Sequence, residues 1–240
     1  MEEIKQLQKI IETSNKIVFF TGAGVSTESG IPDFRSVDGL YNQKYDYPPE
    51  TILSHSFFNY NVDEFYRFYW DKMIYPKALP NNAHEKMAEL EMKGKSLGVV
   101  TQNIDGLHQK AGSKKVYELH GSVYRNYCQN CHKFYSLEDL EQFKGRVPKC
   151  ECQGIIKPDV VLYEESLDDK TVRDAINAIR QADTLIVTGT SLAVYPASGL
   201  IQYFNGYNLV LLNLSVTPYD NEASLIVRGK VGEVLSQIVL

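Results

Sequence analysis

Cysteine is absent from almost all of this sequence. The 240 residues contain four cysteines, and all of them lie between Cys128 and Cys152. The first residues, "MEEIKQLQKIIE", also lack the basic region and the apolar run of a secretory signal peptide. We therefore expect a cytoplasmic protein, in which thiols stay reduced and clustered cysteines hold a metal more often than they form disulfides.

A long apolar run and an excess of basic residues are absent as well. No stretch approaches the roughly 20 apolar residues that a membrane-spanning helix needs. The net charge of −5 provides no overall positive field that would attract nucleic acid or an anionic membrane. We therefore expect neither a membrane nor a nucleic acid as a direct partner.

The spacing of the cysteines indicates what they form. Cys128 and Cys131 make a C-x-x-C pair, and Cys150 and Cys152 make a C-x-C pair, with 18 residues between the two pairs. Two such pairs can supply four thiolates to one tetrahedral zinc ion, at about 2.3 Å per bond. Four sulfurs leave no open position, so the sequence predicts one structural zinc per chain. A redox C-x-x-C and buried thiols without metal are the alternatives.

Short apolar runs alternate with helical patterns along most of the chain. Strands are expected at 16–20, 97–101, 184–189 and 209–213, and helices at 1–14, 61–74, 83–93, 168–182 and 231–239. This alternation is typical of an α/β fold, here a Rossmann-like parallel sheet with helices on both faces. The span 123–155 breaks the rhythm and carries the cysteines, so we expect an inserted small zinc-ribbon module.

The stretch "FFTGAGVSTESG" (19–30) begins inside the first expected strand and continues into a glycine loop. Gly22 permits a tight turn, Gly24 lets backbone amides approach a pyrophosphate, and a following helix would aim its positive end at that phosphate. However, Thr27 occupies the third glycine position, and no acidic residue ends a second strand about 20 residues on. The loop alone is equally consistent with a dinucleotide site and with a purely structural turn.

Polar residues gather after two other expected strands. "TQNIDGLH" (101–108) places Gln102, Asn103 and Asp105 at the carboxyl end of a strand, the edge at which open α/β sheets bind ligands. "ELHG" (118–121) places His120 after an apolar run, and histidine is the side chain best suited to take a proton near neutral pH. A helix N-cap for Asp105 and a structural role for His120 are the alternatives.

Taken together, these motifs resemble one family, the sirtuins, which are NAD-dependent protein-lysine deacylases. The resemblance rests on the four cysteines and on "GAGVSTESGIPDFR" (22–35), "TQNIDGLHQKAG" (101–112), "ELHG" (118–121), "KPDVVLYEE" (157–165), "GTSLAVYPA" (189–197) and "LLNLSVTPYD" (211–220). It covers nearly the whole chain in the family's order. It implies a discontinuous NAD-binding domain at 1–34, 76–122 and 156–240, a cofactor loop and helical module at 35–75, and a zinc-binding module at 123–155.

The resemblance also implies which residues form the site. The catalytic residues would be His120, as general base, with Asn103 and Asp105. Ile104 and Asp105 would form the nicotinamide pocket beside Phe34. The complete set of NAD contacts would be Ala23, Thr27, Phe34, Arg35, Gln102, Ile104, Asp105, His120, Thr190, Ser191, Asn213 and Val231.

The implied reaction is group transfer to ADP-ribose. The acetyl-lysine carbonyl oxygen would attack C1′ of the nicotinamide ribose, and His120 would then act on the ribose hydroxyls. Lysine, nicotinamide and O-acetyl-ADP-ribose would be released, so NAD would be a consumed co-substrate and acetyl-lysine proteins or peptides the partners. A mono-ADP-ribosyltransferase is the alternative enzyme, and a zinc-ribbon binding module is the non-enzymatic alternative.

The substrate peptide is expected to add as a strand between two segments of the chain. The contacting residues would be Val160, Val161, Tyr163, Leu192 and Val194. The sequence departs from the family in this region, because Tyr163-Glu164 replaces the usual phenylalanine-glycine. The replacement adds bulk and negative charge beside the peptide path.

A second departure concerns the acyl group. Sirtuins that remove succinyl groups carry a tyrosine-x-x-arginine pattern, in which the arginine pairs with the acyl carboxylate. Here Tyr66 is present, but Tyr69 stands in place of the arginine. Arg67 would lie roughly 200° around a helix from Tyr69 and face elsewhere. We therefore expect an apolar pocket for acetyl or a longer neutral acyl group.

Overall fold

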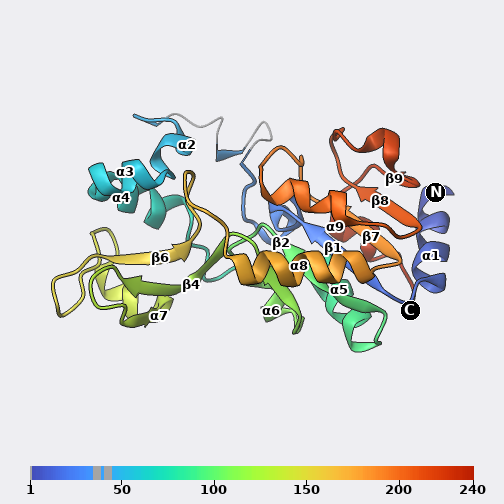
Figure 1. Ribbon diagram of the computed structural model, residues 1–240, viewed down its shortest axis with the longest axis horizontal. Helices are drawn as coiled ribbons and strands as arrows, with labels where there is room; N and C mark the ends of the chain where they lie inside the picture. The colour runs from blue at the N-terminus through green and yellow to red at the C-terminus, as the bar shows by residue number, and fades with distance from the viewer. Residues whose placement is uncertain (1, 35–38, 41–44) are drawn as a thin grey trace.

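The computed structural model describes residues 2–34, 39–40 and 45–240, which form two lobes (Figure 1). The larger lobe is built on a six-stranded sheet and the smaller lobe on a three-stranded sheet. Within the described ranges, no helix has both the length and the apolar character required to cross a membrane.

The larger sheet is parallel throughout, with the strand order β3-β2-β1-β7-β8-β9. All residues of β1 and β7 are buried, as expected for central strands covered on both faces. The Rossmann-like parallel sheet predicted from the apolar runs is therefore confirmed. Its strands are β1 (Ile17–Thr21), β2 (Ser96–Thr101), β3 (Val116–Glu118), β7 (Thr184–Thr188), β8 (Asn208–Leu212) and β9 (Leu225–Val227).

Helices cover both faces of the larger sheet. Three helices pack on one face through a core that includes Leu7, Met87 and Val234, and they are α1 (Glu2–Thr13), α5 (Asn82–Met92) and α9 (Val231–Leu235). Ile179 and Leu200 cover the other face, from α8 (Asp169–Gln181) and the 3₁₀ helix η5 (Ala197–Tyr203). The connections hold short helices: η1 (Ala23–Val25), η2 (Thr27–Ser29), α6 (Leu107–Lys110) and η6 (Asp220–Glu222).

Helix α9 ends at Leu235, before the predicted residue 239. The Gln8 side chain of α1 accepts a hydrogen bond from the Val239 N–H (2.9 Å) and donates one to the Val239 carbonyl (2.7 Å). These bonds draw the last residues onto α1, where Ile238 is buried. Apolar spacing along the sequence does not reveal a bond between residues so far apart.

The smaller sheet is antiparallel, with the order β5-β4-β6. Phe57 and Phe65 pack on it against Val123 and Leu162. Its strands are β4 (Gly121–Cys128), β5 (Phe134–Ser136) and β6 (Ile156–Val160), and its helices are α2 (Pro49–Ile52), α3 (His55–Tyr60), α4 (Val62–Lys72), α7 (Leu137–Leu140) and η4 (Glu141–Phe143). The smaller sheet is longer than the span 123–155, because β4 begins at Gly121 and β6 lies wholly after residue 155. The division of the chain into three units stays a prediction.

Gly121 lies where the chain passes from the larger lobe into β4. Its φ is +74°, and a Cβ there would lie 1.8 Å from the carbonyl oxygen of Asp159 in β6. Only glycine satisfies both the left-handed backbone and this close approach. The glycine after His120 therefore lets the small sheet start immediately beside that histidine.

We expect Gly121→Ala to destabilise the protein more than Gly145→Ala does. Both glycines have a positive φ, but a Cβ at Gly145 meets no atom within 4 Å. The matched control Gly145→Ala therefore carries only the left-handed strain of roughly 1–2 kcal/mol, whereas Gly121→Ala must also displace β6. Thermal unfolding followed by circular dichroism measures both, and equal falls in melting temperature would contradict the steric argument.

Candidate active site

A cavity of about 430 Å³ lies at the carboxyl edge of the larger sheet and reaches the smaller lobe. The loops after β1, β2, β3, β7 and β8 line it, together with the loop after β6. Strands β1 and β7 are neighbours, and the chain continues from them toward opposite ends of the sheet. The cavity therefore sits at the topological switch point, where open α/β sheets bind ligands.

All the described residues predicted to contact NAD line this cavity. They are Ala23, Thr27, Phe34, Gln102, Ile104, Asp105, His120, Thr190, Ser191, Asn213 and Val231. Asn103, the remaining predicted catalytic residue, lines it too. Arg35 lies outside the described residues. The tertiary structure thus brings together residues that are up to 208 positions apart in the sequence.

The glycine loop packs against the turn that follows β7. A Cβ at Gly22 would lie 2.7 Å from the Thr190 Cβ, and one at Gly24 would lie 2.9 Å from the Gly189 Cα. The Gly24 N–H donates to the Gly189 carbonyl (2.8 Å). The glycines thus let two loops touch. The helix expected after this loop takes the form of two short 3₁₀ helices, and Gly30, at φ +82°, ends the second.

The Ser26 hydroxyl joins Asn103 and Asp105, two of the polar residues that follow β2. The Ser26 Oγ donates to Asp105 Oδ2 (2.6 Å) and accepts a hydrogen bond from Asn103 Nδ2 (3.1 Å). The other oxygen of Asp105 accepts from the Leu107 N–H (2.9 Å), so this carboxyl also caps the turn before α6. Burial raises the pKa of Asp105, although its hydrogen bonds oppose that shift.

Ser26 and His84 are residues of this network that the sequence analysis missed. The His84 Nδ1 accepts a hydrogen bond from the Asn81 N–H (3.3 Å), and its Nε2 lies 3.5 Å from the Ser26 Oγ. Burial lowers the pKa of His84 to about 4, so the ring is neutral at pH 7. Ser26 lies inside the glycine motif and could have been noticed there, whereas a histidine within a helical pattern carries no such signal.

His120 is held in one tautomer by a main-chain group. Its Nδ1 lies 3.0 Å from the Gln102 carbonyl oxygen, which can only accept, so Nδ1 carries the proton and Nε2 keeps its lone pair. Burial lowers the pKa of His120, and the hydrogen bond to Gln102 opposes that shift. His120 is therefore neutral near pH 7 and able to take a proton.

The opposite end of the cavity is organised around Thr190. Its hydroxyl accepts a hydrogen bond from Gln102 Nε2 (3.1 Å), and its N–H donates to Asn213 Oδ1 (3.1 Å). The Asn213 amide also donates to the Thr190 carbonyl. Asn213 at the end of β8 thus holds the turn after β7 in place.

The four cysteines converge in the smaller lobe. Their sulfurs all lie within 4.8 Å of one another, and none forms a disulfide. A tetrahedral zinc with bonds of about 2.3 Å needs sulfurs about 3.8 Å apart; the Cys128–Cys152 and Cys131–Cys150 sulfurs lie 3.4 and 3.6 Å apart. The Tyr135 hydroxyl donates to Cys150 Sγ (3.1 Å), and this bond, together with hydrogen bonds from the Cys152 backbone and the neighbouring thiols, lowers the pKa of Cys150 to about 6 and favours the thiolate. The cluster fits one zinc ion, and no cysteine lines the cavity.

The model of the Sir2 family matches residues 22–196, a range that holds the glycine loop, His120 and the four cysteines. The chain belongs to the Sir2 family. The resemblance to sirtuins is therefore confirmed.

Several known proteins are similar to this chain over nearly its whole length. An NAD-dependent protein deacetylase of Clostridium acetobutylicum is 55% identical over 100% of this chain and 99% of its own length. A structure from a study of the mechanism and regulation of Sir2 enzymes has a TM-score of 0.91 at 41% identity, and the match covers 99% of this chain and 96% of that one. A Sir2 complex with 2′-O-acetyl-ADP-ribose and a deacetylated p53 peptide has a TM-score of 0.85 at 41% identity, covering 97% and 96%.

In this Sir2 protein, four of the five residues predicted to contact the substrate peptide line the cavity: Val160, Val161, Tyr163 and Val194. Leu192 instead packs in the core under the larger sheet, with 2% of its surface exposed. Its backbone is left-handed, at φ +56°, and its N–H donates to the Thr190 Oγ1 (3.1 Å). This tight turn directs the Leu192 side chain into the core, away from the cavity at which the resemblance placed it.

Tyr66 and Tyr69 lie in the aromatic core of the smaller lobe of this Sir2 protein. The Tyr66 hydroxyl donates to the Ile156 carbonyl, and the buried Tyr69 hydroxyl has no hydrogen-bond partner within the described ranges. Arg67 faces the surface, where it pairs with Asp46 (3.0 Å) and Glu64 (2.6 Å), as its helical position predicts. Among the described residues, no arginine lines the cavity.

We expect removal of zinc from this Sir2 protein to unfold the smaller sheet first. Metal analysis of the purified protein should find one zinc per chain. Strong chelation or Cys128→Ala should then give fast hydrogen exchange across 123–155, because this segment has little apolar surface of its own. Strands β1 and β7 should stay protected, and added zinc should restore protection after chelation. An ordered 123–155 in zinc-free protein would refute the structural role.

Proposed function

We propose that this chain is an NAD-dependent protein-lysine deacetylase that releases nicotinamide and O-acetyl-ADP-ribose. One observation carries the proposal: the neutral His120 shares a single cavity with the glycine loop and the segment 160–163. A reaction that joins a dinucleotide to a peptide needs both sites and a base between them. The names of the similar proteins support the same activity, since one is called an NAD-dependent protein deacetylase and another holds a deacetylated peptide with 2′-O-acetyl-ADP-ribose.

The proposed reaction consumes NAD. The acetyl-lysine carbonyl oxygen attacks C1′ of the nicotinamide ribose, and the bond from C1′ to nicotinamide breaks. His120 Nε2 takes the proton of a ribose hydroxyl, because Nδ1 already donates to Gln102. The 2′-oxygen then attacks the acyl carbon, and water completes the release of lysine and the acetylated ADP-ribose.

The proposed roles of the other residues follow their places in the cavity. The carboxyl of Asp105 would accept the nicotinamide amide N–H, with Ile104 and Phe34 as an apolar wall and Asn103 beside it. Gln102 would contact the nicotinamide ribose. Residues of the glycine loop would surround the pyrophosphate, and the adenosine half would lie against Thr190, Ser191, Asn213 and Val231. A role for Arg35 in NAD binding rests on the resemblance alone, since Arg35 lies outside the described residues.

The zinc ion would be structural in this enzyme, since four sulfurs complete its coordination and the cluster does not line the cavity. The acetyl-lysine peptide would lie along the loop after β6 as an added strand. We also propose a cytoplasmic location, which is supported by four clustered cysteines that form no disulfide. A mono-ADP-ribosyltransferase would leave a modified protein instead of O-acetyl-ADP-ribose, so mass spectrometry of the products separates the two reactions.

We expect His120→Ala to lower kcat for NAD-dependent deacetylation by about 10²-fold or more, the usual effect of removing a general base. NAD should still bind, which isothermal titration calorimetry can measure. His132→Ala is the matched control, because His132 is exposed and outside the cavity. In the wild type, burial lowers the pKa of His120, so activity should persist at neutral pH and fall only as the pH drops through that lowered value. Near wild-type turnover by His120→Ala would exclude His120 as the base.

We expect acetyl-lysine to be strongly preferred over succinyl-lysine. Lys72 and Lys230 line the cavity, but each is already paired, with Asp71 and Glu233 respectively. A buried carboxylate without a partner costs several kcal/mol, so kcat/KM should fall by about 10²-fold or more for the succinyl peptide. Peptides that differ only in the acyl group test this directly. Equal use of both would show that the pocket supplies a cation.

A further inference from the structure

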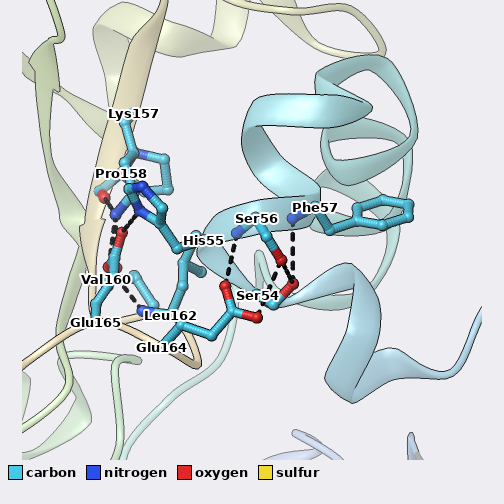
Figure 2. A network of polar contacts seen from close by, with 10 residues as sticks. All are labelled: Ser54, His55, Ser56, Phe57, Lys157, Pro158, Val160, Leu162, Glu164 and Glu165. Atoms are coloured by element: carbon cyan, nitrogen blue, oxygen red, sulfur yellow. Dashed lines mark hydrogen bonds and ion pairs between the residues drawn. The ribbon is translucent and has the colours of Figure 1, made fainter.

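The loop that follows β6 is fastened to the start of α3. The Tyr163 N–H donates to the Leu53 carbonyl (2.9 Å), and the His55 N–H donates to the Tyr163 carbonyl (3.0 Å). Figure 2 shows the loop and the helix held together at this point by further side-chain contacts. The main chain of Tyr163 therefore already has partners and is not available to an added peptide strand.

Glu164 occupies the next position in an unusual conformation. Its φ is +75°, in the left-handed region that favours glycine. Its carboxylate accepts two hydrogen bonds from Ser56, one from the N–H (2.8 Å) and one from the hydroxyl (3.0 Å). Figure 2 shows the Glu164 side chain turned toward Ser56. These bonds fix an exposed carboxylate at the edge of the cavity, which Glu164 also lines.

Glu164 and its neighbour Glu165 differ in whether a cation of the protein compensates their negative charge. The Glu165 carboxylate lies 2.8 Å from His55 Nδ1 and 3.1 Å from Lys157 Nζ, and it also accepts the Leu162 N–H (2.9 Å). Glu164 has no cation within ion-pair distance in the part of the chain that the structure describes. Glu165 is therefore neutralised inside the protein, whereas Glu164 presents an uncompensated negative charge.

The main chain of Glu164 is available to a partner. Its N–H and its carbonyl make no hydrogen bond to any described residue. An extended peptide that adds a strand here would pair with these groups. Because Glu164 has a left-handed φ of +75° and the main chain of Tyr163 is already bonded, such pairing would involve this one residue and not a regular strand ladder. The carboxylate of Glu164, which lines the same cavity as the segment 160–163, would then be within reach of a long side chain next to the acyl-lysine.

We propose that Glu164 is a specificity-determining residue that favours substrates with lysine or arginine next to the acyl-lysine. This inference rests on the proposed deacetylase function and names the chemical class of its peptide substrate. An arginine or lysine beside the acyl-lysine would pair with the fixed carboxylate, whereas an acidic residue there would be repelled. Exposed ion pairs of this kind are weak, so the preference should be about two- to five-fold in kcat/KM for each flanking position.

The test uses acetyl-lysine peptides that differ at a single flanking position, which is arginine, glutamine or glutamate. The full-length wild-type protein should use the arginine peptide best and the glutamate peptide worst, and raising NaCl from 50 to 500 mM should reduce the difference through screening. Glu164→Gln keeps an amide oxygen that can accept the Ser56 N–H but removes the charge. It should bring the ratio of kcat/KM for the arginine and glutamate peptides close to one.

Two further variants complete the experiment. Glu164→Gly suits the positive φ and removes the charge together with the bonds to Ser56, so it should also abolish the preference. Glu141→Gln removes an exposed charge outside the cavity and should keep the wild-type ratio. Deacetylation with no charge preference, or a preference that survives in Glu164→Gln, would overturn this inference alone. No NAD-dependent turnover of any peptide would overturn the proposed function and this inference with it.

Discussion

Strands β1 and β7 lie side by side from Ile17, which pairs with Thr184, to Thr21, which pairs with Thr188. The chain continues from β1 toward one end of the sheet and from β7 toward the other. The loops that leave these strands therefore diverge above the sheet and leave room for a ligand between them. Gly22 and Gly24 can touch the turn at Gly189 only because the two strands are neighbours. The other loops of the larger sheet that line the cavity lie on either side of the β1–β7 pair, so the position of the cavity depends on this pairing.

Burial sets the protonation of the polar groups in that cavity. It lowers the pKa values of His84 and His120 and raises that of Asp105, because a charged group loses hydration there. The histidines are consequently neutral, and hydrogen bonds rather than ion pairs orient them. The bond to the Gln102 carbonyl then decides which nitrogen of His120 is free. Burial therefore keeps His120 neutral, and its hydrogen bond to the Gln102 carbonyl both orients the ring and leaves Nε2 free to take a proton.

The two lobes are linked by the loop after β6 as well as by the strand connection at Gly121. At Glu164 a residue with a side chain stands in a backbone conformation that costs roughly 1–2 kcal/mol for any residue other than glycine. Its two hydrogen bonds to Ser56 offset this strain. The departure from the family's phenylalanine-glycine thus has a structural counterpart, which is a carboxylate fixed on α3 of the smaller lobe at the edge of the cavity.

The sequence by itself determined the features that depend on local spacing. Apolar runs and glycines were sufficient to predict the parallel sheet and its ligand-binding edge, and the two cysteine pairs predicted the four-sulfur cluster. The tertiary structure alone decided that Ser26 bridges Asn103 and Asp105, that Leu192 turns into the core, and that the residues after α9 bind to Gln8 through Val239. The bonds of Ser26 and Gln8 join residues about 80 to 230 positions apart, and the turn at Leu192 depends on one hydroxyl. Such contacts leave no periodic trace in the chain, because they depend on side chains that meet only after the sheet has formed.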